Sequence, residues 1–179
     1  FTVAAQDSGF GDTAVTAHQA AGKLGFGQGE TQKTFQSVAA TDGIACSIDI
    51  LNGQKVEFNQ DDADKTFRYK VTETKGGAAG YTNDTTKYQV DLAVTDRGAG
   101  AMEVTTTVTD VTNDKVVSTT EVRSDDPDGK KIAVIPFTNS YSASGDLGGQ
   151  GSAKIEASKT LKGRTMKKDE FTFQVTNAK

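Results

Sequence analysis

Apolar and polar residues alternate along most of this chain, and such alternation places successive side chains on opposite faces of a β-strand. The segments with this pattern are 1–6, 44–51, 54–58, 66–74, 88–96, 102–108, 115–123 and 131–139. They are rich in Thr and Val, and Gly, Asn and Asp occupy the turns between them, among which Asn52-Gly53 is a strong hairpin signal. Many short strands at close spacing predict an all-β fold, an antiparallel β-sandwich.

Residues 7–43 interrupt this pattern as a long glycine-rich insertion after the first strand. We expect it to be irregular, apart from a short alanine-rich helix over 13–23. Asp12 or Thr13 would cap the start of that helix, and Gly25 lies beyond its end.

One carboxylate, Glu73, falls on the apolar face of a predicted strand. It shares that face with Phe67, Tyr69 and Val71, because residues two apart in a strand point the same way. If this is the core face, Glu73 enters the core, where a carboxylate must find a partner or stay protonated. The alternative is a glutamate at a strand end that leans into solvent, since fully buried Glu is rare.

Asn139 and Lys159 are likewise polar residues on otherwise apolar strand faces. Asn139 is in register with the alternating apolar residues of 133–141, and Lys159 with those of 155–161. Each alone could be a strand-end amide or a lysine that extends its ammonium group to solvent. Together with Glu73, they supply the amine, the carboxyl and the amide that a covalent bond between side chains requires.

Burial would give these three side chains the reactivity for such a bond. It disfavours the ammonium form of Lys159 and so favours the nucleophilic amine. It also raises the pKa of a carboxyl, so Glu73 could hold a proton and donate a hydrogen bond to the side-chain carbonyl of Asn139. The amine would attack Cγ of Asn139, Glu73 would act as general acid and base, and ammonia would leave. Because this isopeptide bond forms once per molecule, we expect a structural protein and not an enzyme.

Charge and composition exclude several other classes of function. The net charge of −4 gives no electrostatic footprint for nucleic acid or an anionic membrane, and no apolar run is long enough to cross a bilayer. The single Cys46 and the lone His18 allow no internal disulfide and give no pattern for a metal. Cys46 fits a small core residue in an apolar alternation. We therefore expect no cofactor.

Three short segments of the chain resemble Gram-positive pilins and their Cna B-type domains. YKVTET at 69–74, followed by Gly80-Tyr81, resembles the E-box of these domains. FTNSY at 137–141 resembles the closing strand of the pilin isopeptide-linkage domains. KIEASKTLKGRTMKKDEFTF at 154–173 resembles their opening strand, which carries the lysine.

The resemblance implies an immunoglobulin-like, Cna B-type sandwich in an extracellular surface protein or pilus that is anchored to the cell wall. Such proteins are built from tandem domains stiffened by internal isopeptide bonds, so adjacent repeats of the same protein are the implied partners. Matched residue by residue, Lys159 takes the role of the cross-linked nucleophile, Glu73 that of the acid and base, and Asn139 that of the cross-linked electrophile.

The order of the segments departs from the family, because the lysine segment comes last here and not first. Residues 1–3 (FTV) match 171–173 (FTF) at an offset of 171 − 1 = 170 residues, which indicates a repeat cut out of phase. We expect a sandwich at 1–141 that lacks its own opening strand and a flexible linker at 142–153. An opening-type strand at 154–179 would then complete a sandwich of the same chain or of a neighbour.

A second hypothesis is a ligand-binding adhesin module, in which the insertion at 7–43 recognises a host glycan or a matrix protein. Aromatic residues make up only 7% of the chain and Trp is absent, whereas such binding sites use aromatic side chains. A thioester-type adhesin head that uses Cys46 has no supporting motif.

Overall fold

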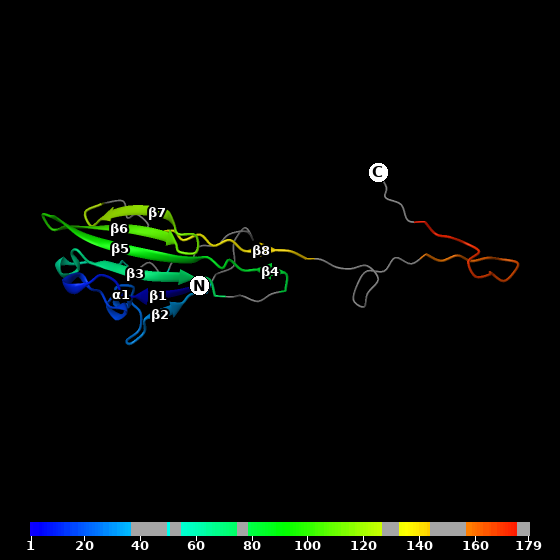
Figure 1. Ribbon diagram of the computed structural model, residues 1–179, viewed down its shortest axis with the longest axis horizontal. Coiled ribbons are helices and arrows are strands. Elements are labelled where there is room, and N and C mark those ends of the chain that lie inside the picture. The colour runs from blue at the N-terminus through cyan, green and yellow to red at the C-terminus, as the bar shows by residue number, and fades with distance from the viewer. Residues whose placement is uncertain (37–49, 51–54, 75–78, 127–132, 144–156, 175–179) are drawn as a thin grey trace. The chain divides into compact units, whose positions relative to one another are not determined.

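The computed structural model describes residues 1–36, 50, 55–74, 79–126, 133–143 and 157–174 (Figure 1). The chain divides into two compact units, Phe1–Tyr141 and Ser142–Lys179. Cys46 and most of the hairpin predicted around Asn52-Gly53 lie outside the described residues.

The first unit is built on a six-stranded sheet with the order β2-β1-β3-β5-β6-β7, in which every neighbouring pair is antiparallel (Figure 1). Its strands are β1 (Thr2–Gln6), β2 (Gln32–Thr34), β3 (Thr66–Thr72), β5 (Lys87–Gly98), β6 (Ala101–Asp110) and β7 (Lys115–Arg123). A small second sheet pairs β4 (Tyr81–Thr82) with β8 (Ser140–Tyr141). These observations confirm the predicted all-β, immunoglobulin-like antiparallel fold.

One face of the large sheet forms the core, as the alternation predicts. Strand β3 buries Phe67, Tyr69 and Val71, and the paired strand β5 buries the residues opposite them. The buried apolar residues of β5 are Tyr88, Val90, Leu92 and Val94. Removing each such side chain from water stabilises the fold by about 1.5 to 3 kcal/mol before the entropy of ordering is subtracted.

The described part of the insertion, residues 7–36, is more regular than its glycine content predicts. Its helix α1 (Ala17–Lys23) begins later than expected, and Thr16 caps it, so the prediction of Asp12 or Thr13 as the cap is wrong. Thr16 and Gln19 form a capping box, whereas residues 11–13 form a separate 3-10 turn, η1 (Gly11–Thr13). The insertion also supplies buried apolar residues to the core, namely Val15, Ala20, Ala21 and Phe26.

The segment 133–139 keeps its alternation but forms no regular strand, contrary to the prediction for 131–139. Its apolar side chains at alternate positions are half-buried and pack against the core, and Phe137 contacts the rings of Phe1 and Tyr88. Pro136 has no backbone N–H to donate to a neighbouring strand, which accounts for the missing ladder. Regular pairing begins only at β8.

In the second unit, residues 157–174 form neither a strand nor a helix. Their contacts are local: Arg164 forms an ion pair with Glu170, and the backbone N–H of Lys167 donates to the same carboxylate at 2.9 Å. Phe171 and Phe173 are exposed. That this segment completes a sandwich stays a prediction.

Candidate functional site

The core face of β3 leads directly to Glu73, which follows the last residue of the strand. Val71 pairs with Tyr88 of β5, and the ring of Tyr88 packs edge-on against Phe137 at a centroid distance of 5.1 Å. Glu73 lies two residues after Val71, and Asn139 lies two residues after Phe137. The apolar contact therefore sets the register in which these two polar side chains approach each other.

The structure brings together two of the three site residues predicted from the sequence. The side-chain nitrogen Nδ2 of Asn139 donates to Oε1 of Glu73 at 2.8 Å, although the two residues are 66 positions apart in the chain. Glu73 is half-buried and Asn139 is exposed, so the pair lies at the edge of the core and not inside it.

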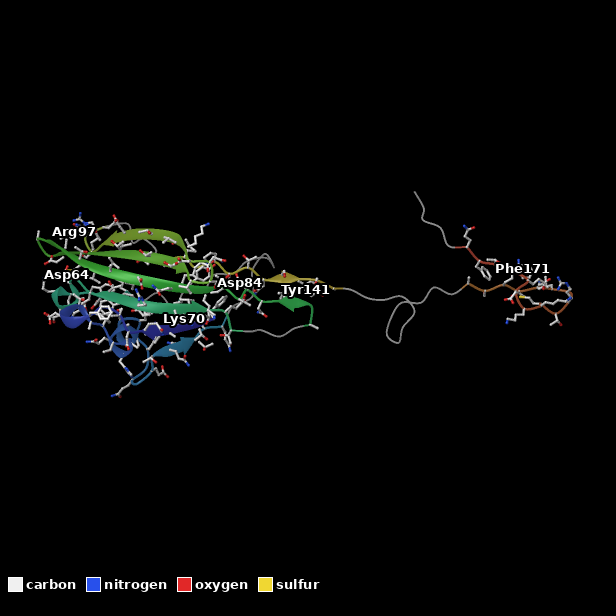
Figure 2. All side chains as sticks on the ribbon, viewed as in Figure 1. Asp64, Lys70, Asp84, Arg97, Tyr141 and Phe171 are labelled. Carbon is white, nitrogen blue, oxygen red and sulfur yellow. The ribbon has the colours of Figure 1, made fainter. Side chains whose placement is uncertain are left out.

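A third residue, Asp84, joins this pair through its backbone. Its N–H donates to Oδ1 of Asn139 at 2.7 Å and to Oε2 of Glu73 at 3.2 Å. Figure 2 labels Asp84 at the end of the large sheet that adjoins the small sheet. Asp84 was not predicted from the sequence, because a loop residue belongs to no strand face. The only sequence signal is an Asp two residues before Thr86, a pattern typical of an Asx turn.

The side chain of Asp84 fixes the loop in place. Its Oδ1 accepts from the backbone N–H of Thr86 at 2.9 Å, and its Oδ2 accepts from the backbone N–H of Thr138 at 2.9 Å. Hydrogen bonds from the Thr86 side chain and from the Thr138 backbone hold the pKa of Asp84 below its ordinary value. The ionised carboxylate thus ties the loop after β4 to the residue that precedes Asn139.

These contacts determine the orientation of the Asn139 amide. A backbone N–H can only donate, so the group of Asn139 that faces Asp84 must be the carbonyl oxygen, and Nδ2 must face Glu73. The expected hydrogen bond from Glu73 to the Asn139 carbonyl is therefore wrong. Glu73 accepts from the amide nitrogen, and the N–H of Asp84 polarises the carbonyl.

The model of the Spy0128-like isopeptide-containing domain family matches residues 1–142. The chain belongs to this family. The match confirms the resemblance to Gram-positive pilin isopeptide domains, and it spans Glu73, Asp84 and Asn139. Neither the comparison with curated proteins nor the comparison with solved structures found a match.

The third predicted site residue, Lys159, lies beyond the part of the chain that matches the isopeptide-containing domain. It belongs to the second unit, where its ammonium group is 5.0 Å from the centroid of the Phe171 ring. The side chain is exposed, and the contact with the ring is a cation–π interaction.

The described part of this isopeptide-containing domain holds no group of three His, Cys, Asp or Glu side chains that could bind a metal ion. Over the same residues, no helix has the length and apolar character needed to span a membrane. What the site does offer is an amide whose oxygen and nitrogen contact different groups. This arrangement is suited to acyl transfer at Cγ of Asn139.

Proposed function

We propose that this chain is a structural stalk or pilus module of a bacterial surface protein, cross-linked by an isopeptide bond between Lys159 and Asn139. The observation that carries the proposal is the 2.8 Å hydrogen bond between Glu73 and Asn139, made across 66 residues at the edge of the core. The family of isopeptide-containing domains supplies the class of protein. A cell-wall-anchored, extracellular location in a Gram-positive bacterium and an arrangement in tandem repeats are part of this proposal.

In the proposed reaction, Lys159, Asn139 and Glu73 each take one role. The neutral amine of Lys159 attacks Cγ of Asn139, a carbon–nitrogen bond forms, and an electron pair moves onto Oδ1. Glu73 takes the proton that the attacking nitrogen loses and passes it to Nδ2, which it already contacts. When the carbonyl re-forms, the bond from Cγ to Nδ2 breaks and ammonia leaves. Each molecule reacts once, so the protein is a substrate of its own chemistry and not a turnover catalyst.

The chain between the two reacting residues is long enough for the bond to form within one molecule. From residue 140 to 158 there are 158 − 139 = 19 linking residues, and at roughly 3.3 Å each they span on the order of 60 Å. A short flexible tether gives an effective concentration on the order of millimolar, above that of ordinary protein solutions. We therefore expect a covalently closed monomer when folding is dilute.

Donation of the lysine segment to a neighbouring molecule is the alternative route. A segment that pairs with the sheet of the next copy by β-strand addition would produce a head-to-tail covalent fibre. Adjacent repeats of the same surface protein are the partners in this arrangement. A ladder of covalent oligomers on denaturing gels that persists at low protein concentration would show donation between molecules.

A ligand-binding adhesin role for the 7–43 insertion has less support. The described part of the insertion packs Val15, Ala20, Ala21 and Phe26 into the core, so these residues serve the fold. Deleting the insertion would therefore test folding more than binding. The exposed Phe10, at 94% exposure, offers a cleaner test. Loss of glycan or matrix-protein binding in Phe10→Ala, with folding intact, would favour the adhesin hypothesis.

Intact-mass measurement of the full chain and of one variant tests the proposal. The wild-type protein should be lighter than its sequence by one ammonia, whereas Glu73→Ala should have the full mass because no group transfers the proton. Glu57→Ala is the matched control, since Glu57 is an exposed carboxylate away from the site. An unmodified mass in well-folded wild-type protein would overturn the proposal, and a cross-link in Glu73→Ala would remove Glu73 from the reaction.

A further inference from the structure

The contacts of Asp84 extend the proposed reaction, on which this inference rests. We propose that the backbone N–H of Asp84 is the oxyanion donor for the tetrahedral intermediate at Asn139, and that the Asp84 side chain positions this donor. The residue thus has two functions in one place. The N–H touches the reacting amide, and the carboxylate holds the surrounding loop.

The position of the N–H matches what an oxyanion donor requires. It lies 2.7 Å from the ground-state position of Oδ1 of Asn139, and an oxyanion donor acts at about 2.7 to 3.1 Å from the place that the charged oxygen comes to occupy. Negative charge develops on this oxygen when the amine attacks Cγ. Because the donor is already in place, the hydrogen bond strengthens in the transition state without reorganisation of the chain.

In this geometry, the oxygen and the nitrogen of the Asn139 amide contact two different groups, which have different roles in the reaction. The N–H of Asp84 faces the oxygen, where charge accumulates, and Glu73 faces Nδ2, which must gain a proton to leave as ammonia. The same N–H also donates to Oε2 of Glu73 at 3.2 Å. It therefore helps to orient the carboxylate toward the leaving nitrogen.

The carboxylate of Asp84 explains how a loop residue can hold a donor in a fixed place. It accepts from the N–H of Thr138, the neighbour of Asn139, and from the N–H of Thr86 within its own loop. The bond to Thr138 connects residues 54 positions apart, and the bond to Thr86 spans two positions within the loop. In both bonds, the negative charge of the Asp84 carboxylate faces a backbone N–H, that of Thr86 or that of Thr138.

Two replacements of Asp84 separate the donor from its support. Malic acid, introduced at position 84 by cell-free translation, changes the amide to an ester, which removes the N–H and keeps the side-chain carboxylate. Asp84→Ala keeps the N–H and removes the carboxylate. Newly made chains are quenched at timed intervals and the cross-linked fraction is read from the intact mass. We expect the ester to slow cross-linking by about 100-fold and Asp84→Ala to slow it by about tenfold.

The matched control is Asp110→Ala. Asp110 accepts from the backbone N–H groups of Thr112 and Asn113 in a similar local turn, and among the described residues no hydrogen bond joins its side chain to Glu73, Asp84 or Asn139. It should cross-link at the wild-type rate. Asp84→Asn, which keeps one acceptor oxygen, should recover part of the rate lost in Asp84→Ala.

A second readout tests the hydrogen bond itself. In isotope-labelled wild-type chain, a scalar coupling through the hydrogen bond should connect the backbone nitrogen of Asp84 with Cγ of Asn139. Cross-linking of the ester variant at the wild-type rate, or absence of the coupling in wild type, would overturn the inference alone. A wild-type chain that never cross-links would instead overturn the proposed function and the inference with it.

Discussion

Residues 1–3 and 171–173 have nearly the same sequence, FTV and FTF, but different structures. In the first unit, this pattern begins β1, which lies between β2 and β3, and Val3 is 1% exposed. In the second unit, the pattern forms no strand, and Phe173 is 56% exposed. Alternation therefore marks a segment that can pair, whereas the neighbouring strands and the apolar face determine whether it does.

The two units also differ in how their polar groups are satisfied. In the first unit, ladders and long-range side-chain bonds such as Tyr69 to Ala20 connect distant segments. In the described part of the second unit, contacts join residues of one short segment, such as Arg164 with Glu170 and Lys159 with Phe171. A segment with an unused strand pattern is suited to β-strand addition, which is the role proposed for the Lys159 segment.

Replacing one phenylalanine in each unit should give the largest difference in the free energy of unfolding between two variants. Phe67 is 2% exposed in the core, so Phe67→Ala should lower the free energy of unfolding by about 3 to 5 kcal/mol through lost burial and a cavity. Phe171, at 41% exposure, is the matched control, and Phe171→Ala should change the free energy of the first unit little. Chemical denaturation measures both. Equal losses would mean that the second unit contributes to the same core.

Loss of the cross-link should have the next largest effect on stability, because the bond would join the two units through their side chains. Glu73→Ala leaves the reactants in place but should prevent the bond. By analogy with a disulfide, which restricts the unfolded chain, the loss should be about 2 to 5 kcal/mol. Thermal unfolding of Glu73→Ala beside Glu57→Ala measures it. Equal stability of the two variants would contradict a stabilising cross-link.

A buried hydrogen bond in the first unit should give a smaller difference in stability between a buried and an exposed tyrosine. The hydroxyl of Tyr69 donates to the backbone oxygen of Ala20 at 2.9 Å and fixes α1 on the sheet. Tyr69→Phe leaves this buried oxygen without its donor and should cost about 1 to 3 kcal/mol. Tyr141→Phe, at an exposed position, should cost little. Urea unfolding of the two variants makes the comparison, and a larger loss in Tyr141→Phe would reverse the expected order.

The smallest expected effect is the pH dependence that Asp84 contributes. Its pKa in the folded protein lies below the ordinary value of 3.8, because Thr86 and Thr138 donate to the carboxylate. The unfolded chain therefore binds the proton more readily. The stability that Asp84 adds is present above about pH 4 and is lost as the pH falls through the lowered pKa.

Thermal unfolding of wild type and Asp84→Asn across this acidic range tests the effect. The wild-type midpoint should fall more steeply below about pH 4, and the two curves should run parallel above it. Identical slopes over the whole range would show that Asp84 carries no linked proton.

Sequence pattern predicted the long strands well and the irregular segments poorly. The alternation at 66–74, 88–96, 102–108 and 115–123 corresponds to β3, β5, β6 and β7. Strands β3, β5 and β6 each bury one face, whereas β7 lies at the sheet edge and its residues are exposed or half-buried. The segment 133–139 kept its alternation but not its pairing, since Pro136 cannot donate to a ladder. The helix began at Ala17 because Thr16 and Gln19 form a capping box.

In the candidate site too, the residues on strand faces could be predicted from the sequence and the loop residue could not. Glu73 and Asn139 stood out in the sequence because each continues an apolar strand face, and a face has a fixed register. Asp84 sits in a loop, and its partner Thr138 is 54 residues away, a distance that no local pattern can bridge. The direction of the Glu73–Asn139 bond depends on the N–H that faces the opposite end of the amide, so it too required the folded arrangement.

Peptide mapping of the full chain by mass spectrometry tests directly whether Lys159 and Asn139 are joined. After proteolysis, we expect one branched peptide in which Nζ of Lys159 is bonded to Cγ of Asn139, recovered from monomer at low protein concentration. The Lys159→Ala chain should yield only linear peptides, and Lys162→Ala should yield the branched one. Linear peptides that carry Lys159 and Asn139 unmodified in folded wild-type protein would contradict the account.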